Sequence, residues 1–185
     1  MAAPTTSSSA VSAPRAWASG STNADLETYR RVWGGDPVGG GDNAAVPAGT
    51  RQVPMLFGGF APAALARMAR MGDGYIGPSM PAEMVAGSFE QARAAWQKHG
   101  RAGQPRLVAI CYFALGDPDQ GPANVHDYYS FMGDTADMIA GTVRTTHEEV
   151  RQAVKDFGDM GADELVFNPA TANLDDVATL AEIVF

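Results

Sequence analysis

The chain has 185 residues, of which 45% are hydrophobic and 18% are charged, a composition typical of a globular protein. Its net charge is −8 and its pI is near 4.7, which argues against nucleic acid as a partner because no basic stripe is present to neutralise phosphates. No apolar run approaches the ~20 residues that span a bilayer, and no secretory signal opens the chain, so no membrane partner is expected. The single cysteine, Cys111, excludes a disulfide framework and favours a reducing, cytoplasmic location.

The amino-terminal stretch, residues 1–22, differs in composition from the rest of the chain. It is dominated by Ala, Ser, Thr and Pro and carries one charge, Arg15. Such a stretch buries too little apolar surface to offset the entropy lost on ordering, so we expect it to be disordered. One folded domain is expected over residues 23–185.

The stretch from Val53 to Ser79 has the pattern of a βαβ unit. The apolar run Val53 to Phe57 predicts a fully buried strand that ends at a pair of glycines. A helix is predicted from Pro62, which suits a first helical turn, to Gly72. Tyr75 and Ile76 begin a second strand. Such a unit makes a parallel sheet with a right-handed crossover.

The glycine pair Gly58-Gly59 admits two interpretations. Glycines at the carboxyl end of a buried strand let the backbone approach a ligand, and the amides of the next helix attract a phosphate. Alternatively, the glycines only make a tight turn. This pair by itself does not decide between the two.

Apolar residues at helical or strand spacing predict the remaining elements. The run 106–115 is apolar on both faces, and the sequence does not say which face meets the helices. Between the helices and strands, the segments 36–51 and 116–124 are loops by composition. Two further strands are predicted, Arg106 to Leu115 and Glu164 to Asn168. Helices are predicted from Asn23 to Trp33, from after Pro81 to about His99, and from Val125 to Gly141. Two more helices are predicted, one starting at a capping box formed by Thr146 and Glu149 and one starting after a cap at Asn173.

Alternating βα units leave two main α/β architectures open, a doubly wound sheet and a (β/α)8 barrel. Three runs, YRRVWGGDPV, VPMLFGGFAPAALARMARMGDGYI and VRQAVKDFGDMGADELVF, resemble the bacterial luciferase-like family of flavin-dependent oxidoreductases. The resemblance covers residues 25–185 and matches the carboxyl-terminal half of the family only. It implies a partial (β/α)8 TIM-barrel-like fold with about four βα units and parallel strands.

The resemblance also implies a cofactor site and an activity. The cofactor would be FMN or a deazaflavin coenzyme, bound at the carboxyl ends of the strands. The activity would be that of an oxidoreductase or monooxygenase, with hydride transfer between the reduced cofactor and a small organic substrate. The implied cofactor-binding residues are Gly58, Gly59, Phe60, Ala61, Tyr75 and Ile76.

No catalytic residue can be assigned from the sequence, and no histidine–carboxylate spacing indicates a metal site. His126, with Tyr128 and Tyr129, follows the long loop after the strongest strand, where barrel enzymes keep their chemistry. A histidine there can act as an acid or base. The more conservative interpretation, which we favour, is a solvent-facing histidine beside packing aromatics.

Two functional hypotheses remain at this stage. The first is the flavin-dependent oxidoreductase, completed by a second copy or by a complementary half-barrel. The second is a truncated, non-catalytic half-barrel that serves as a binding or assembly module. Both predict a homo-oligomer or another assembly, because a half-barrel leaves sheet edges and one sheet face unpaired.

Overall fold

A computed structural model describes residues 23–37, 39–47 and 49–185. The chain divides into two compact units, Met1–Gln52 and Val53–Phe185, and each is described by itself. The stretch 1–22, predicted to be disordered, lies outside the described residues. No helix among the described residues is long and apolar enough to cross a membrane.

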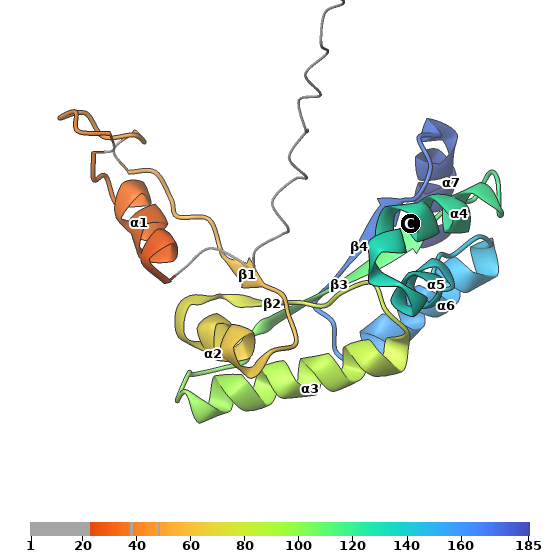
Figure 1. Cartoon of the computed structure of the whole chain (residues 1–185), viewed down its shortest axis with the longest axis horizontal. Helices are drawn as coiled ribbons and strands as arrows, with labels where there is room; N and C mark the ends of the chain where they lie inside the picture. The colour runs from red at the N-terminus through yellow and green to blue at the C-terminus, as the bar shows by residue number, and fades with distance from the viewer. Residues whose placement is uncertain (1–22, 38, 48) are drawn as a thin grey trace, which may run out of the picture. The chain divides into compact units, whose positions relative to one another are not determined.

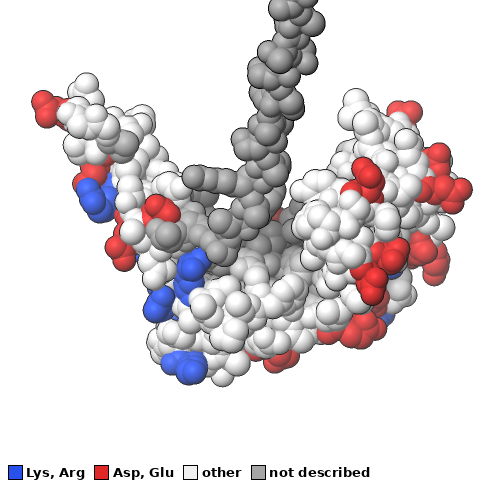
Figure 2. Space-filling view, in the orientation of Figure 1, with Lys and Arg blue, Asp and Glu red and all other residues white. Residues whose placement is uncertain are grey.

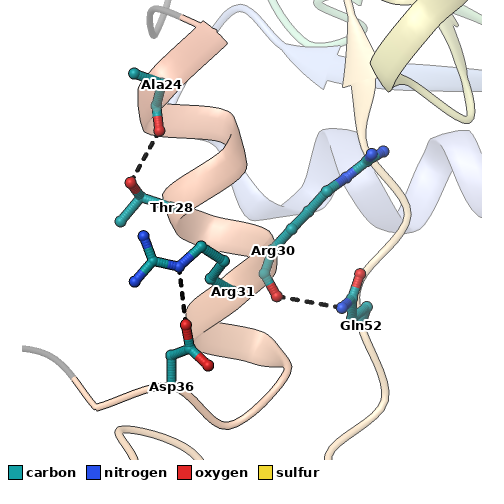
Figure 3. A network of polar contacts seen from close by, with 6 residues as sticks. All are labelled: Ala24, Thr28, Arg30, Arg31, Asp36 and Gln52. Atoms are coloured by element: carbon teal, nitrogen blue, oxygen red, sulfur yellow. Dashed lines mark hydrogen bonds and ion pairs between the residues drawn. The ribbon is translucent and has the colours of Figure 1, made fainter.

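The described part of the amino-terminal unit has one helix, α1 (Asn23–Trp33), followed by an irregular segment. The hydroxyl of Thr28 donates to the carbonyl of Ala24, one turn earlier, at 2.8 Å. Arg31 forms an ion pair with Asp36 at 2.8 Å, and Gln52 donates to the carbonyl of Arg30 at 3.3 Å, as Figure 3 shows. The last two contacts tie the segment back to the helix.

The carboxyl-terminal unit is built on one sheet of four parallel strands in the order β1-β2-β3-β4. The strands are β1 (Leu56–Phe57), β2 (Gly74–Ile76), β3 (Arg106–Phe113) and β4 (Glu164–Pro169). Each strand lies beside the next one in the chain, with no reversal of order. A doubly wound sheet requires a switch point in its strand order, whereas a barrel adds its strands in sequence. The order therefore confirms the partial TIM-barrel-like fold with parallel strands.

One face of this sheet carries the main core. Helices α2 (Pro62–Met71), α3 (Ala82–Lys98) and α6 (His147–Asp159) contribute to it, and Figure 1 shows α2 and α3 on one side of the sheet. The strand side chains in this core alternate with those of the opposite face, as the strand period of two requires. Members of the core from all three helices and the central strands include Met68, Tyr75, Phe89, Leu107, Cys111 and Phe157.

The first strand is shorter and less buried than expected. We predicted a fully buried strand over Val53–Phe57, but β1 covers only Leu56–Phe57 and both residues are half-buried. Val53 is 60% exposed. The reason is position: β1 lies at one edge of the sheet and pairs only with β2 among the described residues, and Pro54 has no N–H to donate.

The segment between β3 and β4 also differs from expectation. Instead of a loop over 116–124 and one helix over 125–141, it forms α4 (Gln120–Tyr129), the 3₁₀ turn η1 (Ser130–Met132) and α5 (Asp134–Ala140). Helix α4 begins early because Asp117 Oδ1 accepts the amides of Asp119 and Gln120, at 3.0 and 3.1 Å. The single helix is interrupted at Gly133, where φ is +59°.

The predicted caps of the last two helices are confirmed. Thr146 and Glu149 form a capping box at the start of α6, and Asn173 Oδ1 accepts the amide of Asp175 at the start of α7 (Leu174–Val184). Cys111 is buried, as expected for a thiol in an apolar strand.

Candidate functional site

The turn between β1 and α2 presents a row of backbone donors. The amides of Gly59, Phe60, Ala61 and Ala63 have no hydrogen-bond partner among the described residues, and all four residues are exposed. Pro62 between them has no N–H, and Ala61, the N-cap, has extended backbone and no side-chain cap. The start of α2 thus offers free N–H groups and the positive end of its dipole to an acceptor.

The geometry of this turn favours glycine at Gly59 and leaves little room for a side chain at Gly58. Gly59 has a φ of +107°, which side chains other than glycine rarely adopt. A Cβ on Gly58 would lie 3.3 Å from the carbonyl oxygen of Ile76, so the turn passes closely over the end of β2. The two glycines therefore make a tight turn, and this turn leaves the amides of Gly59, Phe60 and Ala61 accessible.

Tyr75 and Ile76 lie on opposite faces of the sheet. The Tyr75 side chain is 1% exposed and packs edge to face on Phe89 of α3, with ring centroids 6.3 Å apart. Burial raises the pKa of Tyr75 by more than the neighbouring Ser88 side chain lowers it, and the geometry gives its hydroxyl no hydrogen bond to any described residue. At the β1–α2 turn, therefore, Tyr75 can offer backbone only. Ile76 is half-buried on the other face, next to Gly58.

The sheet face opposite the main core is apolar in its middle. The pairing Ile76↔Val108 and Ile110↔Val166 places these residues on that face, together with Leu56 of β1. Val108 is buried, whereas the other four are only partly buried. In a closed barrel this is the face that points inward.

An aromatic cluster lies at the carboxyl end of β3. Tyr112 of β3 and Tyr129 of α4 join their hydroxyls at 3.0 Å. The ring of Tyr128 packs edge to face on Tyr129, with centroids 4.8 Å apart, and Phe131 lies 6.5 Å from Tyr129. Burial, followed by the hydrogen bond and proximity of Tyr112, raises the pKa of Tyr129, so this phenol stays protonated.

A pocket of about 220 Å³ opens beside this cluster. Helix α4 packs closely on the segment after β3 because Gly121 has no side chain. A Cβ at Gly121 would lie only 2.3 Å from the Cβ of Ala114. The side-chain amide of Asn124 donates to the backbone carbonyl of Ala170 at 2.9 Å and holds α4 against the end of β4. The pocket is lined by Tyr112, Asn124, Val125, Tyr128, Tyr129, Pro169 and Ala170.

The histidine singled out above does not enter this pocket. His126 is half exposed and lies 3.3 Å from Asp137 of α5, a surface pair. This agrees with the conservative interpretation of His126. Among the residues that the structure describes, no three His, Cys, Asp or Glu side chains gather as metal ligands.

Sequence reasoning missed the pairing of Tyr112 with Tyr129. We treated Tyr128 and Tyr129 as packing residues and left open which face of its strand Tyr112 lies on. The run of aromatics after a loop at the end of the strongest strand was the available signal. Only the register of β3 shows that Tyr112 points to the same side as that run.

Solved structures provide the comparison with known proteins. An F420-dependent secondary alcohol dehydrogenase, in complex with an F420-acetone adduct, is similar over 88% of this chain, with 14% identity and a TM-score of 0.63. An F420-dependent tetrahydromethanopterin reductase from Methanopyrus kandleri is similar over 86%, with 14% identity and a TM-score of 0.53. The monooxygenase RslO1 from Streptomyces bottropensis is similar over 85%, with 21% identity and a TM-score of 0.52.

At these identities the likeness is one of fold. The chain spans 60%, 59% and 56% of the lengths of these three proteins. No family model and no curated protein matches the sequence.

Proposed function

We propose that this chain forms half of a flavin-type oxidoreductase site of the luciferase-like class. The observation that carries the proposal is the row of free amides from Gly59 to Ala63 at the carboxyl edge of a half-barrel. The fold is shared with enzymes whose names include coenzyme F420 or a monooxygenase activity. The carboxyl edge of parallel strands is where barrel enzymes place their sites.

The residues of the β1–α2 turn fit the phosphate of FMN or of a deazaflavin coenzyme. Gly58 and Gly59 bring the backbone close, and the amides of Phe60 and Ala61 donate to phosphate oxygens at the start of α2. Ile76, on the inner face, supplies an apolar wall, and Tyr75 contributes through its backbone. The bound cofactor supplies the hydride chemistry; the chain binds it, orients it and excludes water.

The substrate of the proposed enzyme is a small organic molecule, and the site is completed by a second copy or by a complementary half-barrel. Four strands cannot enclose a ring system, so oxidoreductase activity depends on that assembly. Cofactor anchoring depends only on the β1–α2 turn and is expected in the chain as it exists.

Cofactor binding is the direct test. Purified chain is titrated with FMN and, separately, with the deazaflavin, and the cofactor fluorescence is followed. We expect saturable binding of one of them with a Kd on the order of tens of micromolar. Gly59→Val, which forces a side chain into a left-handed backbone, is expected to weaken it, whereas Gly87→Ala on the exposed side of α3 is not. The absence of saturable binding to both cofactors contradicts the proposal.

A further inference from the structure

The pocket beside Tyr112 and Tyr129 has the properties of a ligand site that differs from the β1–α2 turn. It lies at the carboxyl ends of β3 and β4, and its volume of about 220 Å³ is below the ~300–1,000 Å³ of pockets for drug-sized ligands. A single six-membered ring with a short substituent suits this volume. Its rim is open to solvent, because Tyr128 is 60% exposed.

The pocket walls select for a flat ring. Tyr112, Tyr128 and Tyr129 present three aromatic rings, with Val125 and Pro169 as apolar neighbours. Aromatic walls favour an aromatic guest through edge and face contacts, beyond the area that they bury.

The hydroxyl pair selects for an acceptor oxygen. In a pair of phenols at 3.0 Å one hydroxyl donates to the other, and the second proton has no partner in the pair. A phenol is protonated at neutral pH, and burial raises the pKa of Tyr129 further, so the pair offers a donor and not a phenolate. A carbonyl oxygen on the ligand is the matching group.

The charges around the pocket favour a neutral ligand. Residues 116–143 contain no Lys or Arg, and their acids are Asp117, Asp119, Asp127, Asp134 and Asp137. Arg144 follows this segment and donates its backbone amide to the carbonyl of Tyr112, but its side chain lies beside Cys111, which faces the main core. Figure 2 shows acidic side chains gathered over the part of the carboxyl-terminal unit that holds α5, α6 and α7. This surrounding negative charge disfavours a carboxylate ligand.

We propose that this pocket binds a neutral aromatic carbonyl compound, with its ring packed against the aromatic walls and its carbonyl oxygen accepting from the Tyr112–Tyr129 hydroxyl pair. The assignment of this compound as the substrate class rests on the proposed function; the binding itself does not.

The test uses the full chain with acetophenone as the probe and no cofactor present. Binding is followed by saturation-transfer NMR, and its place by the ring signals of labelled tyrosine. We expect saturable binding that shifts the signals of Tyr112 and Tyr129. Toluene, which lacks the carbonyl, cyclohexyl methyl ketone, which lacks the aromatic ring, and benzoate, which is anionic, are each expected to bind roughly threefold or more weakly.

Variants separate the hydroxyl pair from the ring walls. Tyr129→Phe keeps the ring and removes the donor, and we expect roughly fivefold weaker binding of acetophenone. Tyr29→Phe removes an exposed tyrosine hydroxyl from a residue that does not line the pocket, so binding is expected to be retained. If Tyr129→Phe loses the native circular dichroism spectrum, Tyr112→Phe replaces it.

The proposal is overturned by the absence of saturable acetophenone binding, by equal binding of toluene, cyclohexyl methyl ketone or benzoate, or by no effect of either paired-tyrosine variant. The cofactor titration is read separately. Acetophenone binding without cofactor binding contradicts the proposed function and leaves the pocket assignment intact, and the reverse result contradicts only the pocket.

Discussion

At Gly59 the chain turns from β1 into α2 with a φ of +107°. An alanine at this position forces an L residue into disfavoured backbone and brings its Cβ to 3.2 Å from that of Ala64. We expect Gly59→Ala to lower the free energy of unfolding by about 1–3 kcal/mol. Gly87→Ala is the matched control: nothing lies within 4 Å of the added methyl, and the free energy should rise by about 0.5–1 kcal/mol. Equal effects of the two substitutions in urea unfolding would contradict the conformational argument.

The carboxylate of Asp176 is 2% exposed and ties the end of β3 to α7. It accepts hydrogen bonds from the backbone amide of Leu115 at 3.2 Å, from the hydroxyl of Thr171 at 2.9 Å and from the side-chain amide of Asn173 at 2.9 Å. We expect Asp176→Ala to lower the free energy of unfolding by about 2–3 kcal/mol, because three donors lose their acceptor. Asp175→Ala, at the exposed neighbouring position in the same helical turn, should cost less than about 1 kcal/mol. Thermal or urea unfolding of both variants tests this, and a similar loss in both would rule the network out as the cause.

Among the helices and strands, we expect the stability of the capped first turn of α6 to depend on pH. Burial tends to raise the pKa of Glu149, but hydrogen bonds from the backbone and hydroxyls of Thr145 and Thr146 outweigh it, so the net pKa is lowered. A carboxyl whose pKa is lower in the folded state stabilises the fold above its unfolded pKa. That stabilisation is lost as pH falls through the folded pKa.

We therefore expect Glu149→Gln to be less stable than the unaltered chain at pH 7, by about 0.5–1 kcal/mol, and the difference to vanish in acid. Glu148→Gln is the control, since Glu148 lies in the same first turn but is exposed. Urea unfolding across pH 2.5 to pH 7, chosen to bracket the ordinary carboxyl pKa of about 4.3, is the measurement. A gap for Glu149→Gln that is independent of pH would contradict the hydrogen-bond account.

At the scale of the whole molecule, the four-stranded sheet leaves both of its edges and part of one face uncovered by the described residues. Among the described residues, β1 and β4 each pair along one edge only, and Leu56, Ile76, Ile110 and Val166 of the inner face are partly exposed. Large apolar side chains left wet forfeit about 1.5–3 kcal/mol each, against a typical domain stability of about 5–15 kcal/mol.

We therefore expect the chain to associate with a second copy or with a complementary half-barrel. Light scattering at low micromolar concentration should show a mass above that of the monomer. If the chain is a monomer, thermal unfolding should show no cooperative transition. A single species of monomer mass that unfolds cooperatively would contradict this prediction.

The sequence by itself determined the features that depend on neighbouring residues. The α/β class, the caps at Thr146 and Asn173 and the glycine turn after β1 follow from periodicity and from local backbone chemistry. Strand 106–113 is apolar on both faces, so its pattern could not say which face meets the helices. Only the packing of α2, α3 and α6 against Leu107, Ala109 and Cys111 decided that. It leaves Tyr112 on the opposite face, where it meets Tyr129, 17 residues away. The sequential strand order was likewise undecided, because the contacts that select it join segments far apart in the chain.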